Sequence, residues 1–151
     1  MAADYDLNEV ADAIALRWNG LTTMEYDGVD RPLTALSEVY GDVQPPAIVL
    51  ELDDVDWDLT MGRGSDTFTF LAYLIVASAD SRSGQRLVRQ LMSTGGPAGR
   101  LKDAMDGVGV DRTLGGLVSI VHMPSPRSVG RINYSGVDYL GAILPIEVTA
   151  Q

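Results

Sequence analysis

The sequence contains no cysteine and only one histidine, His122, among its 151 residues. The absence of thiols excludes disulfide bonds and thiolate metal sites, and it is compatible with a reducing cytosol. No apolar run approaches the ~20 residues that span a bilayer. The first residues, MAADYDLNEV, carry acids where a secretory signal carries Lys or Arg. We therefore expect neither a membrane segment nor export by that route.

Positive charge is also scarce. The chain has 11 Lys and Arg residues against 21 Asp and Glu residues, so its formal net charge is −10. This balance argues against a protein that grips nucleic acid over a large surface, because phosphate binding needs clustered basic residues. The aromatic residues show no basic interleaving of the kind that a nucleic-acid stacking platform requires. The length and the hydrophobic content of 46% fit one domain with a sizeable core.

The charge is unevenly distributed along the chain. Residues 1–80 carry a net charge of −13, residues 81–102 carry +5, and residues 103–151 carry −2. The basic segment is compatible with a solvated helix face. It is also compatible with a molecule that has complementary faces, suited to head-to-tail association in a ring.

Apolar residues recur at helical spacing near the start of the chain and predict an amphipathic helix over residues 6–19. Asp6 can cap the first turn of this helix, and Gly20 ends it. Two shorter helices are predicted over residues 82–92 and 97–105, where apolar positions again recur at helical spacing.

Six strands are predicted from alternation and from β-branched and aromatic residues, at residues 22–26, 47–52, 67–78, 117–123, 128–134 and 137–149. The alternation of the second strand continues to Leu59. The strand at 67–78 is apolar along nearly its whole length, which predicts a central position with both faces covered. A turn at Ser135-Gly136 joins the last two strands. Because Pro145 cannot donate to a ladder, we expect the last strand to lie at an edge or to carry a bulge.

Residues 27–46 are rich in Gly and Pro and predict a long connection with one helical turn at residues 34–40. We interpret this connection as a contact arm. The predicted fold class is α+β, with a single domain over residues 1–151. We expect a mostly antiparallel sheet of about five or six strands with helices packed on it.

The segment DLTMGRGSDTFTF at residues 58–70 raises the possibility of a phosphate-binding loop. Such a loop needs glycines between a strand and a helix, with a lysine or a third glycine at fixed spacing. Here Gly62 and Gly64 lead into a strand, and neither additional residue is present. We interpret the segment as a turn whose Arg63 projects from its tip.

Asp54, Asp56 and Asp58 resemble the start of a calcium loop. Leu59 and Ser65 occupy the positions where that loop requires Gly and Glu, so the pattern fails. Alternation explains the run better, because it places the three carboxylates on one face of a strand.

His122 is the one candidate for histidine-based catalysis, and its predicted strand position is typical of a packed or edge residue. A catalytic triad can be assembled from distant residues, but no serine lies in a Gly-x-Ser-x-Gly elbow. A small hydrolase that uses His122 with a nearby carboxylate stays an alternative. The sequence favours a structural or assembly role, and we expect no enzymatic activity, no cofactor and no metal site.

The order of several segments carries more information than any one of them. These are PPA at residues 45–47, the acidic strand, the GRGSD turn, a helical pair broken by Ser and Gly, DRTLGG at 111–116 and YLGA at 139–142. Their order and spacing resemble the tail terminator proteins, also called tail completion or neck proteins, of long-tailed actinobacterial phages. The resemblance covers most of the chain, although residues 27–44 form a longer segment than we expect in that family.

The resemblance implies an α+β subunit of a homo-hexameric ring in the tail or neck region of the virion, assembled in the host cytoplasm. Such a ring caps the tail tube, stops tube polymerisation and provides the surface for joining to the head. The implied partners are other copies of the chain, the tail tube protein and the neck or head–tail connector proteins. DNA passes through the lumen without specific binding. A head-side neck adaptor is the alternative role.

Two sets of charged residues are candidates for this role. A lumen lined by carboxylates repels the phosphates of passing DNA, so some of the acids of the second strand and its turn are expected to face the channel. These acids are Asp53, Asp54, Asp56, Asp58 and Asp66. The expected contact with a neighbouring subunit or an adjoining ring consists of Arg63, Arg82, Arg86, Arg89, Arg100 and Lys102.

Overall fold

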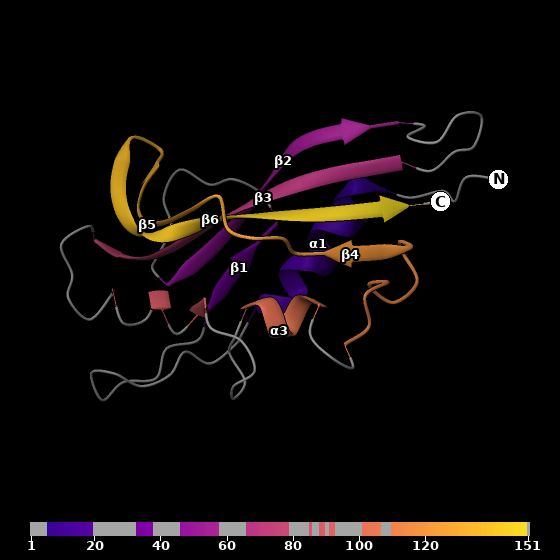
Figure 1. Cartoon of the computed structure of the whole chain (residues 1–151), viewed down its shortest axis with the longest axis horizontal. Helices are drawn as coiled ribbons and strands as arrows, with labels where there is room; N and C mark the ends of the chain where they lie inside the picture. Colours follow the sequence, from indigo (N-terminus) through magenta and orange to yellow (C-terminus); the bar gives the residue numbers. More distant parts are fainter. Residues whose placement is uncertain are drawn as a thin grey trace.

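The computed structural model is a curled, six-stranded mixed sheet with one long helix packed against it (Figure 1). It describes residues 6–19, 33–37, 46–57, 66–78, 85, 88–89, 91–92, 101–106 and 110–150. The helices are α1 (Leu7–Trp18) and α3 (Leu101–Asp106). The strands are β1 (Thr34–Leu36), β2 (Ala47–Asp56), β3 (Asp66–Ser78), β4 (Ile120–His122), β5 (Ser128–Tyr134) and β6 (Val137–Ala150).

The strand order is β1-β2-β3-β6-β4, and β5 also pairs with β6. Every pairing is antiparallel except that of β1 with β2, so the prediction of a mostly antiparallel α+β sheet is confirmed. The predicted layer of helices is thin, because besides α1 it consists of the six-residue α3 and the described helical residues 85, 88, 89 and 91.

Helix α1 forms where its apolar spacing predicts. Asp6 caps it, with the Oδ1 atom accepting a hydrogen bond from Asn8 N at 2.8 Å. Val10, Ile14 and Trp18 are fully buried. The indole Nε1 of Trp18 also donates to the carbonyl oxygen of Leu101 at 3.0 Å, and this buried bond ties α1 to α3. The main core therefore lies between these helices and one face of the sheet, which we call the inner face.

Strand β3 is central, as its apolar run predicts, because it lies between β2 and β6. Phe68, Phe70 and Leu74 belong to the core on the inner face. On the opposite face, here called the outer face, Ile75 is fully buried in a second, smaller apolar cluster. That cluster includes Tyr134 from the end of β5, so the β5–β6 hairpin covers part of the outer face.

Two features explain how the hairpin reaches the outer face. The predicted turn is confirmed, since Ser135 and Gly136 both have positive φ angles, of 54° and 83°. Further along β6, Gly141 lies opposite a bulge in β3 between Ile75 and Ala77. A Cβ atom on Gly141 would lie 1.7 Å from the carbonyl oxygen of Leu74, so only glycine permits this close approach.

The expectation that Pro145 places the last strand at an edge is wrong. The alternative expectation, a bulge at Pro145, is not met either, because the bulge in the β3–β6 pairing lies opposite Gly141. Strand β6 pairs with β3 on one side and with β5 and β4 on the other. The carbonyl oxygen of Ile143 points to the second side, where it accepts from Arg127 N at 2.9 Å. By alternation Pro145 N points the same way, into the gap between the segments paired with β5 and β4. The missing donor therefore breaks no described ladder bond.

Other predicted boundaries also change. Residues 34–36 form a strand parallel to residues 47–49, so the predicted helical turn at 34–40 is wrong there. The strand predicted at 117–123 is confined to Ile120–His122, because residues 112–117 form turns. The strand predicted at 22–26, most of the 27–46 contact arm and most of the 82–92 helix lie outside the described residues.

Candidate interaction surface

The uncovered part of the outer face carries most of the charged side chains that the sheet brings together. Directly paired residues share a face, so the strand registers define rows of side chains across this surface. One row consists of Asp54, Thr69, Glu147 and His122. The next row consists of Asp56, Thr67, Thr149 and Ile120. All three acids of these rows are exposed.

A bulge in β2 adds further carboxylates to the outer face. The register shifts between Leu52 and Asp54, so simple alternation, which would turn Asp53 away from Asp54, does not hold there. Asp53 Oδ2 instead accepts a hydrogen bond from Arg127 Nη2 at 3.2 Å, within an ion pair. Burial raises the pKa of the neighbouring Tyr73, and the negative charges of Glu51 and Asp53 raise it further.

The structure separates the five predicted channel acids. Asp53, Asp54 and Asp56 are exposed in one strand, and the bulge gives them a common surface. Asp66 pairs with Ala150, whose side chain is buried in the core, so Asp66 lies on the inner face instead. Asp58 lies outside the described residues.

Exposed apolar side chains accompany these acids. Leu52 is 42% exposed and Trp57 is 72% exposed, and both belong to the acidic segment of β2 or follow it directly. Within the described residues, no three Asp, Glu or His side chains converge as metal ligands would. The carboxylates are therefore distributed over a surface that can repel anions or contact a basic partner.

Two of the candidate residues of the predicted basic interface, Arg89 and Lys102, lie in the described part of the chain. Arg89 is exposed, with its Nε atom donating to Gln85 O at 3.3 Å. Lys102 is exposed on α3, and its Nζ atom donates to Met123 O at 2.8 Å. Arg63, Arg82, Arg86 and Arg100 lie outside the described residues.

Lys102 and His122 border an open groove of about 410 Å³ beside β4. The floor and walls of this groove are Met123, Pro124, Ser125 and Pro126. A smaller, more apolar hollow continues from it and adds Leu91, Met92, Leu101 and Leu144. His122 and Glu147 are directly paired between β4 and β6, so the structure places a carboxylate beside the histidine of the hydrolase alternative, and both side chains are exposed on the outer face.

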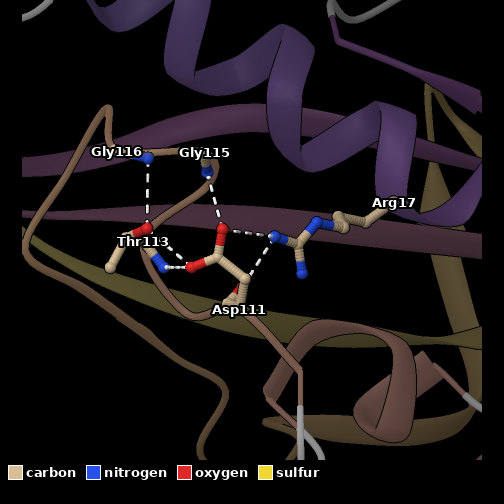
Figure 2. A network of polar contacts seen from close by, with 5 residues as sticks. All are labelled: Arg17, Asp111, Thr113, Gly115 and Gly116. Atoms are coloured by element: carbon tan, nitrogen blue, oxygen red, sulfur yellow. Dashed lines mark hydrogen bonds and ion pairs between the residues drawn. The ribbon is translucent and has the colours of Figure 1, made fainter.

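A polar network at DRTLGG holds the loop before β4 against α1 (Figure 2). Asp111 accepts hydrogen bonds from Thr113 N at 2.8 Å, Thr113 Oγ1 at 2.6 Å and Gly115 N at 3.0 Å. These bonds, the Thr113 hydroxyl foremost, lower the pKa of Asp111, and the nearby Arg17 contributes. The guanidinium of Arg17 also donates to Asp111 O at 2.6 Å. The sequence analysis gave Asp111 no role, although an Asp is favoured in turns because its side chain can bond the backbone two residues further on.

No helix within the described part of the chain is long and apolar enough to cross a membrane. Comparison of the sequence with protein-family models and with curated proteins finds no match.

Proposed function

We propose that this protein is a structural subunit of a phage tail, a tail terminator that assembles into a ring on the end of the tail tube. The observation that carries the proposal is the uncovered part of the outer face, where five acids lie on paired strands. These acids are Glu51, Asp53, Asp54, Asp56 and Glu147. The order of sequence segments that resembles the terminator family supports it from a second direction.

The charge of the chain suits a ring through which DNA moves. Six copies with a net charge of −10 each carry roughly −60 before screening, a field that acts over about 8 Å at physiological salt. If the outer faces line the bore, their carboxylates repel the phosphates of the DNA. The genome then slides through without being retained.

The mechanism is one of competitive binding. The ring occupies the end of the tube that the next ring of tube subunits would occupy, and its other side does not accept a further tube ring. This requires two chemically different sides. The separation of acidic residues 1–80 from basic residues 81–102 provides a source of that difference.

Electron microscopy of the purified protein in negative stain tests the assembly. The expected result is six-fold rings with a central hole, with a mass six times the 16.2 kDa of one chain. A protein that stays monomeric at every concentration contradicts the proposal.

Phage assembly without the protein tests the role of the ring. Tubes that lengthen without limit are expected for a terminator. Tubes of normal length that fail to join heads would assign the protein to the alternative role, a head-side neck adaptor.

A further inference from the structure

Trp57 is a large aromatic residue whose side chain is mostly exposed, as is typical of a residue that contacts another protein. It directly follows β2 and is 72% exposed, whereas the other tryptophan, Trp18, is fully buried. Exposed tryptophans are enriched among the few residues that dominate binding energy at interfaces. Asp54 and Asp56 lie just before Trp57 at the end of β2 and are also exposed, so negative charge lies close to the indole along the chain.

The groove beside β4 has the opposite character. Pro124 and Pro126 provide apolar walls above the buried Met123, and Lys102 and His122 lie at the border of the groove. Proline rings make an apolar surface against which an aromatic ring can pack. The Lys102 ammonium places positive charge beside that surface, where an incoming carboxylate would be attracted.

From these apolar and oppositely charged groups we propose that Trp57 of one copy inserts into the β4 groove of the next copy, with Asp56 directed toward Lys102. The proposal rests on the proposed function, because it specifies the contact that joins neighbouring subunits of the ring.

The position of the two features in the sheet favours contact between copies over contact within one copy. Strands β3 and β6 separate β2 from β4, so three strand spacings, or about 14 Å, separate the two sides of the contact. Along the described residues, β1 pairs only with residues 47–49, which leaves the Asp56 end of β2 at the sheet edge. A contact from one edge to the opposite edge is head-to-tail, the arrangement that closes into a ring.

The contact also orients the outer face. When opposite edges of the same sheet meet around a ring, the sheets of successive copies form a continuous wall. Glu51, Asp54 and Glu147 then lie on one surface of that wall in every copy. One contact thus accounts both for ring closure and for a carboxylate-lined bore.

A charge exchange between two variants tests the contact in the full-length protein. Lys102→Glu alone places Glu against Asp56, and Asp56→Lys alone places Lys against Lys102, so each variant is expected to remain monomeric. An equal mixture pairs opposite charges at every contact and is expected to form rings. Light scattering after size-exclusion chromatography measures the mass of each sample and of the mixture.

Removal of the indole is the second arm. Trp57→Ala is expected to weaken the contact by roughly 30-fold, the loss typical of an aromatic hot spot. Leu16→Ala is the matched control, since Leu16 is 75% exposed on α1 and its loss is expected to leave assembly unchanged. Circular dichroism verifies that every variant is folded.

The outcomes separate the contact from the function. A wild-type protein that never forms rings overturns the proposed function. If the wild type forms rings, each of three results overturns only this contact. The three results are that Trp57→Ala assembles normally, that Leu16→Ala loses assembly as much as Trp57→Ala does, and that the charge-exchanged mixture fails to recover rings.

Discussion

At the scale of single residues, Asp111 organises the loop that precedes β4. Its carboxylate satisfies two backbone N–H groups and one hydroxyl in a loop where Leu114, Gly115 and Gly116 all have positive φ angles. A non-glycine residue in that region is strained, so the loop needs such bonds to persist. Because Arg17 donates to the same residue, the loop is fixed to the end of α1.

Replacement of Asp111 with Asn is expected to lower stability in a pH-dependent way. The pKa of Asp111 is lowered in the folded protein, so its carboxylate contributes stability above the unfolded-state pKa. That contribution is lost as pH falls through the lower, folded-state pKa. The melting temperatures of wild type and variant should therefore differ most near neutral pH and converge below about pH 4.

Asp12→Asn, an exposed change on α1, is the control for this experiment. It is expected to show a small difference from wild type at neutral pH. A constant gap between Asp111→Asn and wild type from neutral to acidic pH would show that shape rather than charge matters at this position.

Sequence reasoning reached some residues and missed others for identifiable reasons. The cap at Asp6 and the burial of Trp18 were predictable because they depend on spacing within one helix. The placement of Asp53 was not, because a bulge changes which face a strand residue occupies and leaves no clear pattern in the sequence. The bond from Trp18 to Leu101 joins residues 83 positions apart and could not be predicted from local signals.

At the scale of elements, β6 determines the shape of the sheet. It pairs with β3 along its length and with β4 and β5 on its other side. Its apolar face was evident from the sequence, and its boundaries differ by one residue from those predicted. Its central position was not predictable, because Pro145 normally marks an edge and the gap between β5 and β4 is a property of the assembled sheet.

Gly141→Ala is expected to destabilise the protein by about 3 kcal/mol, the upper part of the range for overpacking in a filled region. The added methyl group would meet the Leu74 backbone, which cannot move aside without disturbing the β3 bulge. Urea unfolding, followed by circular dichroism, measures the change in the free energy of unfolding.

Gly130→Ala provides the comparison for this variant. Gly130 pairs with Gly141 and has a φ of 115°, but a Cβ atom there would meet nothing within 4 Å. Its substitution should therefore cost only backbone strain, about 1–2 kcal/mol. A Gly141→Ala variant as stable as Gly130→Ala would contradict the steric explanation.

At the scale of the whole molecule, the β5–β6 hairpin covers one half of the outer face and leaves the other half exposed. The β5–β6 hairpin curls over one half, where Tyr134 packs against Tyr73 with ring centroids 5.9 Å apart. The other half is bare and acidic. The net charge was evident from composition, whereas its concentration on one face depends on register and on the β2 bulge.

Charge reversal within this acidic half tests whether it faces DNA. Asp54→Lys with Glu147→Lys changes two side chains of one row and raises the net charge of −10 by four units per chain. In the proposed ring, this double variant is expected to bind short duplex DNA at low salt, because clustered lysines would replace carboxylates along the proposed bore. The affinity should fall steeply as salt rises.

Asp12→Lys with Asp138→Lys makes the same change in net charge at exposed positions outside these rows. If position rather than total charge decides retention, rings of this control should bind DNA as weakly as wild-type rings do in fluorescence anisotropy. Equal binding by the two double variants would mean that the outer face has no special relation to the DNA path. Binding by the row variant alone would place that face along the bore, since only there do six copies of two lysines surround one duplex.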